Sequence, residues 1–356
     1  MYKRQLLRFV AATLVLVDHS FVLTGRHGLP GPFAYETLGG FAVAVFFIIS
    51  GFLVAASWER EPHAGAFATK RALRIVPAYF AVIIAGAVVL GPILTELTLG
   101  RYFGQYDSWA YLWNLTFIRL HYSLPGVFAS NPYLHAVNGS IWTLPIEIAM
   151  YVVLAVLGRM GLINRAGVTV LVLVLAFGWI GWEPQLMTAG SLLLPVLPAF
   201  YTVHLALWFF LGSAFWLWRT RIRYRSDVAV ALLALLWATQ ATRAGAILFH
   251  GALPYLVLWA AQIGVPWMNR FGRHGDFSYG MYLWAFPVQQ TFSMLGGAGW
   301  PHLVYLGASF VVTLSCAVAS WHLVEHPALR LKSRRSGSAP EKPPDRTVAR
   351  SVTQGE

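Results

Sequence analysis

Residues 38–58 read LGGFAVAVFFIISGFLVAASW, a run without a single charged side chain. An α-helix rises about 1.5 Å per residue, so this run is long enough to cross the hydrocarbon core of a bilayer, which is about 30 Å thick. Similar runs recur along the chain. We predict ten spans, at 6–24, 38–58, 75–93, 139–158, 166–183, 199–218, 227–243, 246–264, 277–296 and 303–324. The expected fold is therefore an all-α, polytopic helical bundle in a membrane.

The composition agrees with this fold class. Of the 356 residues, 57% are hydrophobic and only 11% are charged, whereas a soluble protein carries roughly a quarter charged residues. The single cysteine, Cys316, excludes an internal disulfide and a cysteine-based metal site. No Walker motif, nucleophile elbow or paired-histidine metal helix is present, and we predict no metal in the site.

The charges are distributed asymmetrically between the two sides of the predicted spans. Of the 26 Lys and Arg residues, 22 fall on the side that also carries both termini, and the other four are Arg26, Arg101, Arg119 and Arg243. Basic residues in short loops stay in the cytoplasm, so both termini are expected there. The net charge of +12 is explained by this topology, and no nucleic-acid partner is expected.

The chain is expected to form one transmembrane domain at 1–332, followed by a disordered cytoplasmic tail at 333–356. The tail is rich in Pro, Ser and charged residues and nearly lacks apolar ones, a composition typical of disorder. The longest segment between spans, 94–138, is rich in aromatic residues. These either form an interfacial belt, which is the favoured interpretation, or a lid or sugar-stacking surface over an outward-facing site.

Ionisable residues within a span are costly and usually functional. Asp18 and His19 lie in the first span and Glu147 in the fourth. From the helical rise, His19 and Glu147 fall at about the same depth, in the outer half of the core. The alternative is that each only bridges helices by hydrogen bonding. Asp18 points about 100° away from His19 and is expected to orient the helix.

Further polar residues are predicted near this depth. Ser140, Thr143, Glu147 and Tyr151 follow a spacing of three and four residues, so they form one polar stripe on the fourth span. Lipid would not tolerate such a stripe, which indicates a wet cavity. The ninth span adds Gln289 and Gln290, also in its outer half.

A second cluster is basic and cytoplasmic. Arg8 opens the first span, and Arg71 and Arg74 precede the third at a spacing that places them on one helix face. Guanidinium groups bind phosphate through paired hydrogen bonds. The alternative is that they only anchor the helices on the cytoplasmic side.

Taken together, the segments resemble the acyltransferase-3 family, whose integral membrane members O-acylate surface polysaccharides, lipopolysaccharide and some secondary metabolites. The resemblance covers nearly the whole chain, although each motif alone is weak. The matching segments are Arg8 with His19 eleven residues later, Phe46–Leu53, Arg71–Pro77, Ser140–Glu147, Phe277–Trp284 and Glu325–Pro327. One position departs: Ala285 stands where many members carry a histidine after the Tyr-Leu-(Trp/Tyr) of the ninth span.

The resemblance implies a function. The donor is expected to be cytoplasmic acetyl-CoA, and the acceptor a hydroxyl of a glycan outside the cell membrane, that is, the inner or cytoplasmic membrane of a bacterial cell. His19 is expected to act as general base or, as the lesser alternative, to be acylated itself, and Glu147 to orient it or the sugar. Arg8, Arg71 and Arg74 are expected to hold the coenzyme phosphates. The expected acceptor-binding residues are Asp18, Ser140, Trp142, Tyr151, Gln289 and Gln290.

The rival interpretation is a transporter or flippase that moves a sugar or lipid-linked glycan without chemistry. The absence of an inverted repeat and the spacing of the cytoplasmic arginines count against it. Membrane lipid and a glycan are the expected partners, and the oligomeric state is left open by the sequence.

Overall fold

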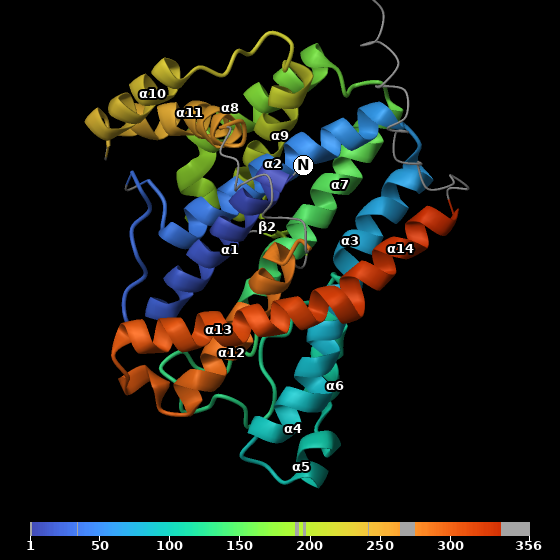
Figure 1. Cartoon of the computed structure of the whole chain (residues 1–356), viewed down its shortest axis with the longest axis vertical. Coiled ribbons are helices and arrows are strands. Elements are labelled where there is room, and N and C mark those ends of the chain that lie inside the picture. Colours follow the sequence, from blue (N-terminus) through green and yellow to red (C-terminus); the bar gives the residue numbers. More distant parts are fainter. Residues whose placement is uncertain are drawn as a thin grey trace, which may run out of the picture.

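The computed structural model describes residues 2–33, 35–188, 192–194, 197–240, 242–263 and 275–335, and most of these residues are helical (Figure 1). Each of the ten predicted spans falls on a helix. The first four are α1 (Tyr2–Val22), α2 (Leu38–Arg60), α3 (Ala64–Ala85) with its continuation through a π-turn (Gly86–Leu90) into α4 (Gly91–Leu94), and α7 (Thr143–Arg159). The other six are α8 (Arg165–Thr188), α9 (Ala199–Leu217), α10 (Ser226–Ala238), α11 (Arg243–Ala260), α12 (Ser278–Met294) and α13 (His302–Ser320).

The helices confirm an all-α, multi-pass membrane protein. Among the described residues, seven helical segments are long and apolar enough to cross a membrane, while α10 and the described part of α8 are shorter apolar helices. The helix α12 has 17 residues. A total of ten crossings and the cytoplasmic placement of the termini therefore stay predictions. Among the described residues, the two strands β1 (Leu192–Leu194) and β2 (Leu197–Pro198) form a small antiparallel sheet.

The division into a domain at 1–332 and a tail at 333–356 stays a prediction, and the last described helix runs slightly past 332. A π-turn at Trp321–Glu325 follows α13 and leads into α14 (His326–Arg335), which continues three residues beyond 332. The rest of the predicted tail, 336–356, lies outside the described residues.

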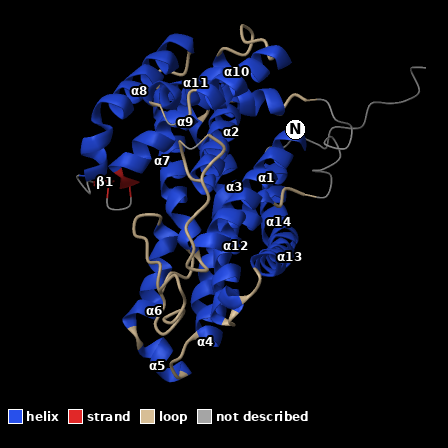
Figure 2. Cartoon of the chain, turned by 90° about the vertical axis from the view of Figure 1, so that its left-hand side faces the viewer, coloured by secondary structure: helices blue, strands red, loops and turns tan. Residues whose placement is uncertain are grey.

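The segment 94–138 forms short helices and ordered loops. It contains α5 (Leu99–Gly104), α6 (Tyr106–Ala110) and a 3-10 helix at Tyr111–Thr116, and a second 3-10 turn at Gly139–Trp142 leads into α7. These short helices gather at the end of the molecule opposite to α10 and α11 (Figure 2). Its large side chains divide into two groups, because Tyr102 and Tyr111 are buried while Tyr106 and Trp109 are exposed.

Helices α2 and α9 pack closely against each other. A Cβ added at Gly51 would overlap the carbonyl oxygen of Phe209, and one at Gly212 would overlap that of Ile48. Small residues let helix backbones approach closely in a membrane, where van der Waals packing drives association. The hydroxyl of Ser213 adds a hydrogen bond of 3.1 Å to the Gly51 carbonyl oxygen across the same contact.

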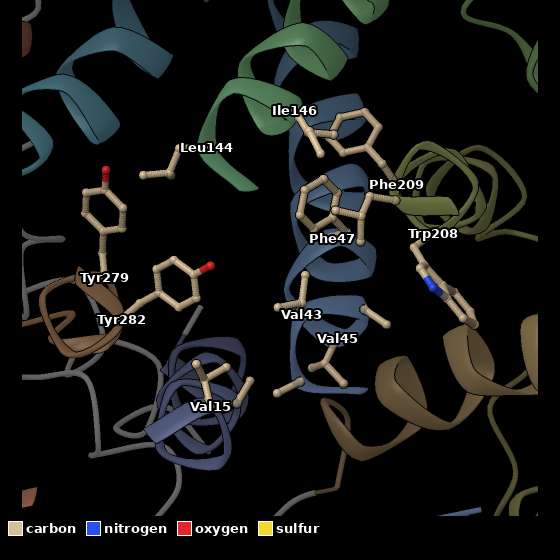
Figure 3. Packing of buried hydrophobic residues seen from close by; sticks show 14 of the residues in the cluster. Val15, Val43, Val45, Phe47, Leu144, Ile146, Trp208, Phe209, Tyr279 and Tyr282 are labelled. Atoms are coloured by element: carbon tan, nitrogen blue, oxygen red, sulfur yellow. The ribbon is translucent and has the colours of Figure 1, made fainter. Parts of the chain in front are cut away.

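The core surrounds α2. Phe47 of α2, Ile146 of α7 and Phe209 of α9 point toward one another (Figure 3), and all three side chains are buried. Val15 of α1 and Tyr282 of α12 belong to the same buried cluster. This packing brings α1, α2, α7 and α12 together, and α1, α7 and α12 carry seven of the eleven predicted site residues.

Candidate active site

A cavity of about 510 Å³ lies beside the C-terminal half of α1. This volume is within the range of roughly 300–1,000 Å³ that is usual for small-molecule sites. The helices contribute His19, Trp142 and Phe286 to the lining, and the loop before α7 contributes Tyr122, Tyr133 and His135.

His19 is the ionisable group of α1 that reaches this cavity. The edge of its ring packs against Phe286, with the ring centroids 5.3 Å apart. Its Nδ1 is buried and has no hydrogen-bond partner among the described residues. An unpaired polar atom of this kind is rare in a folded interior and marks a group that is free to bind a ligand.

The arginines at the other end of α1 are held by two carboxylates. Asp276, just before α12, accepts hydrogen bonds from Arg8 at 3.2 Å and from Arg74 at 2.7 Å, and Arg74 also contacts Glu325 at 3.4 Å. Burial alone would raise the pKa of the Asp276 carboxyl. The charges of Arg74 and Arg8 and the hydrogen bonds from Ser278 outweigh burial, so this pKa lies below its ordinary value. The carboxylate therefore stays ionised and fixes both guanidinium groups.

Arg71 differs from these two arginines. Its guanidinium lies over the ring of Tyr151, 5.9 Å from the centroid. Its Nε is buried without a hydrogen-bond partner in the described part of the chain. Since no carboxylate pairs with it there, Arg71 is the guanidinium of this cluster that has capacity left for an anionic ligand.

The polar stripe of α7 lies between the cavity and this cluster. The Glu147 carboxylate accepts hydrogen bonds from Ser50 of α2, at 2.9 Å, and from Tyr151. One turn toward the cavity, Thr143 is hydrogen-bonded to Tyr282 of α12 at 2.7 Å. No hydrogen bond joins Glu147 to His19 among the described residues. The stripe therefore ties α7 to α2 and α12, and Glu147 is linked to Arg71 through Tyr151.

Comparison with known proteins identifies the class. The acyltransferase-domain model of the acyltransferase-3 type matches residues 5–322. The chain belongs to this family. A relative from Shigella phage Sf6, named O-acetyl transferase, is 30% identical over 332 residues, which cover 89% of this chain and 93% of the relative. Nodulation protein 10 of Rhizobium leguminosarum bv. viciae is 31% identical over 367 residues, which cover 92% and 93%. No solved structure matches the chain.

The family confirms that the protein is an enzyme, an acyltransferase, and it decides against the transporter. It leaves the roles of single residues as predictions. Of the predicted acceptor-binding residues, Trp142 lines the cavity of this acyltransferase, and it packs against Tyr201 with the ring centroids 4.9 Å apart. Tyr151 is bonded to Glu147, and the carbonyl oxygen of Ser140 accepts a hydrogen bond from Tyr282 at 2.9 Å.

The remaining polar residues brace the walls of the acyltransferase cavity. Asp18 is buried and accepts a hydrogen bond of 3.0 Å from the backbone of Leu29, so it anchors the loop between α1 and α2. Gln289 donates to the carbonyl oxygen of Leu16 at 2.9 Å, and its own Oε1 is buried without a partner among the described residues. Gln290 is buried and bonded to the loop before α7.

The departure at Ala285 has a structural explanation in this acyltransferase. Ala285 is fully buried against Ala12 and Leu16 of α1 and Ala317 of α13. The neighbouring residue, Phe286, reaches the cavity instead. In this chain position 285 is therefore a close-packing position between three helices.

Sequence reasoning missed several residues of the acyltransferase site. Asp276 was not singled out, although it stands directly before the Phe277–Trp284 motif, and Glu325 was noted only as part of a motif. A search for acidic partners of Arg8, Arg71 and Arg74 would have suggested both. His135 gave no signal apart from its place in the aromatic segment 94–138.

Proposed function

We propose that this acyltransferase is an O-acetyltransferase of the cytoplasmic membrane. It moves an acetyl group from cytoplasmic acetyl-CoA to a hydroxyl of a glycan on the outer side. The observation that carries the proposal is that α1 bears two functional groups, one near each end. Arg8 is near one end, in a cluster of arginines, and His19 lies near the other, with an unpaired ring nitrogen beside a cavity.

The acetyl group is supported by a relative. The protein of Shigella phage Sf6 is named an O-acetyl transferase, and this chain matches it over nearly its full length. The glycan acceptor is supported by the family resemblance and by the cavity, which lies at the end of α1 that charge asymmetry places outside.

The arginine cluster is suited to the donor phosphates. Arg71 has unpaired hydrogen-bonding capacity, whereas Arg8 and Arg74 are held in place by Asp276. In this arrangement Arg71 is the primary phosphate ligand. Asp276 already sets the orientation of the Arg8 and Arg74 guanidinium groups, whose remaining N–H groups can bind the phosphates. Less side-chain entropy is therefore lost on binding.

The distance along the helix suits the donor's shape. Eleven residues separate Arg8 from His19, which corresponds to roughly 16 Å of helix. Coenzyme A carries its thioester at the end of a long, narrow pantetheine arm. In this proposal the phosphates stay at the arginines while the thioester reaches His19.

In the reaction, His19 accepts the proton of the acceptor hydroxyl as that oxygen attacks the thioester carbonyl carbon. A new C–O bond forms, the C–S bond breaks, and the proton passes from His19 to the departing coenzyme thiolate. An imidazole suits this role because it accepts and returns a proton near neutral pH. Glu147 has an indirect role here: it holds Tyr151 and, through it, the face on which Arg71 lies.

The test compares the wild-type protein with His19→Gln in lipid nanodiscs. Thiol release from acetyl-CoA is measured in vitro, and acetyl esters on surface glycans of the producing cells are measured by mass spectrometry. A general base contributes about 10²–10⁴-fold, so His19→Gln should lose transfer to that extent while coenzyme binding persists. Substantial transfer by His19→Gln would end the proposal for His19, and an absence of acetyl esters in wild-type cells would end the proposed reaction.

A further inference from the structure

The loop that faces His19 across the cavity is fixed by one residue of α12. The side chain of Gln290 donates hydrogen bonds of 2.8 Å to the carbonyl oxygens of Tyr133 and Ala136. Its Oε1 and its backbone carbonyl oxygen both accept hydrogen bonds from Asn131, at 2.8 and 2.9 Å. Four hydrogen bonds from a fully buried side chain and its own backbone leave this loop little freedom.

At the centre of the loop, His135 has an unusual backbone. Its φ is 62°, in the left-handed region that residues other than glycine rarely adopt. The backbone N–H of His135 donates to the carbonyl oxygen of Phe128 at 3.1 Å, and an isolated β-bridge pairs Ser123 with Ala136 beside it. Such backbone strain persists only where surrounding contacts impose it, and it is concentrated at ligand sites. Here those contacts direct an imidazole toward the cavity that also contains His19.

Aromatic rings connect His19 with the loop that carries His135. The ring of Phe286 makes edge contacts with His19 on one side and with Tyr133 on the other, at centroid distances of 5.3 and 5.9 Å. Phe286 is 4% exposed and Tyr133 is 42% exposed. Phe286 is therefore fixed in the core, while part of the Tyr133 side chain is accessible to a ligand. A Cβ at Gly139 would overlap the Phe286 ring, so glycine is needed there for this arrangement.

The cavity lining lacks permanent charge. Among its described lining residues there is no Lys, Arg, Asp or Glu, and the polar groups come from histidine, tyrosine, serine, tryptophan and backbone atoms. An acceptor with a carboxylate or phosphate would lose its hydration here without gaining an ionic partner, which is costly. Uncharged, hydroxyl-rich ligands with an apolar face do not incur this cost.

We propose that the cavity binds an uncharged pyranose unit of the acceptor and that His135 determines which hydroxyl is acetylated. The inference rests on the proposed function and deepens it. The C–H face of the sugar packs on Tyr133, since an aromatic face attracts weakly positive C–H groups. His135 hydrogen-bonds one hydroxyl of the ring and thereby places another hydroxyl at His19. The rigid loop serves to keep the two imidazoles at a constant separation.

The experiment measures binding separately from transfer. Saturation-transfer NMR on the protein in nanodiscs uses methyl glycosides of glucose, galactose, mannose and rhamnose, and the charged methyl glucuronoside and galacturonoside. The variant His135→Gly removes the imidazole and also relieves the backbone strain, so weaker binding cannot be a result of strain. His135→Asn tolerates the left-handed backbone and keeps a hydrogen-bond donor. The matched control is His27→Ala, an exposed histidine of the loop between α1 and α2 that does not line the cavity.

We expect at least one neutral glycoside to bind and the uronosides to bind weakly or not at all. Loss of one hydrogen bond should weaken the neutral glycoside by about 2- to 10-fold in His135→Gly, with partial recovery in His135→Asn and no change in His27→Ala. In transfer assays His135→Gly should raise the acceptor KM more than it lowers kcat and should spread acetylation over more than one hydroxyl.

Three results would overturn the inference while leaving the proposed reaction intact. These are uronoside binding as tight as that of neutral glycosides, equal affinities in His135→Gly and His27→Ala, and binding of no glycoside by a protein that still releases thiol from acetyl-CoA. Failure of the wild-type protein to turn over acetyl-CoA at all would overturn the proposed function and the inference with it.

Discussion

At the residue scale, neighbouring side chains have different roles because a helix turns by about 100° per residue. Asp18 faces the loop between α1 and α2 and anchors Leu29, while His19 faces the cavity. Gln289 and Gln290 also point in different directions, because Gln289 bonds to α1 and Gln290 bonds to the loop before α7. A polar residue in a span thus marks a helix contact or a ligand contact, and its neighbour can be the other kind.

Arg71 and Arg74 should respond differently to substitution. Arg71→Ala should weaken coenzyme A binding and leave folding intact, because no carboxylate among the described residues depends on it. Arg74→Ala should lower stability by about 3–5 kcal/mol, since it leaves Asp276 and Glu325 buried with a missing partner. Arg74→Lys should restore only part of this loss because the two-pronged contact is gone.

The measurements are coenzyme A affinity by calorimetry and the melting temperature in detergent. Arg223→Ala is the control, since Arg223 is an exposed residue of the loop between α9 and α10. If Arg71→Ala and Arg223→Ala bound coenzyme A equally well, Arg71 would not be a phosphate ligand.

At the element scale, the close pairing of α2 with α9 positions the site. Helix α2 carries Ser50, the hydrogen-bond donor to Glu147, and the next residue is Gly51, which contacts α9. Ser50 is adjacent to this contact, so a change in the distance between α2 and α9 would also move Ser50 and its hydrogen bond to Glu147. The small residues at this contact serve geometry as well as stability.

Substitution of glycine tests this pairing. Gly51→Ala should destabilise the protein by about 1–3 kcal/mol, because the added methyl group forces the α9 backbone away. Gly251→Ala on α11 is the matched control: nothing lies within 4 Å of a Cβ there, and replacing a helical glycine stabilises by about 0.5–1 kcal/mol. Melting temperatures that fell equally in both variants would show that the close contact of α2 and α9 is not required.

At the scale of the whole molecule, the fold places a charged cluster and an uncharged cavity at opposite ends of α1. The arginines and their carboxylates lie near the start of α1, and the uncharged cavity lies near its end, with the polar stripe of α7 between them. An enzyme that takes a charged donor from one side of a membrane and a glycan from the other requires such a separation. This separation has the proposed role only if the two ends of α1 lie on opposite sides of the membrane.

Cysteine labelling tests the topology in a background in which Cys316 is replaced by alanine. Gly104→Cys, in the exposed end of α5, should react with an impermeant maleimide from outside intact cells. Arg223→Cys should react only after the membrane is opened, because 22 of the 26 basic residues fall on its side. External labelling of Arg223→Cys in intact cells would show that the predicted topology is wrong.

Stability should also depend on pH through Glu36, in the loop between α1 and α2. Burial raises the pKa of Glu36 from 4.5 to about 7, and its carboxyl faces His204 of α9 at 3.1 Å, which in turn contacts His250 of α11 and Trp208. Since the folded pKa exceeds the unfolded one, the stabilisation is complete below about pH 4.5 and is lost as pH rises through 7.

Glu36→Gln should remove this dependence. Between pH 5 and pH 8 the wild-type protein should lose on the order of 1–3 kcal/mol relative to the variant, measured as melting temperature in detergent. If the melting temperatures of the two proteins changed with pH in the same way over this range, the pKa of Glu36 would not be raised by burial.

The sequence by itself determined the fold class and the helical segments, and it predicted the depth of the main polar residues. Each of these is a local property: a span must be a continuous apolar helix, because lipid offers no hydrogen bonds to an exposed backbone. Depth follows from the constant rise per residue. The motifs from Arg8 to Pro327 indicated the family, which the match over residues 5–322 confirms.

Only the tertiary structure decided which polar side chains meet. His19 and Glu147 were placed at matching depth, but Glu147 is bonded to Ser50 and Tyr151, since the direction a side chain faces depends on how the helices pack. Asp276, directly before α12, pairs with Arg8 of α1 and Arg74 of α3. Gln290 fixes a loop some 150 residues away in the chain. Such contacts depend on the distance and rotation between helices, which no local pattern of residues specifies.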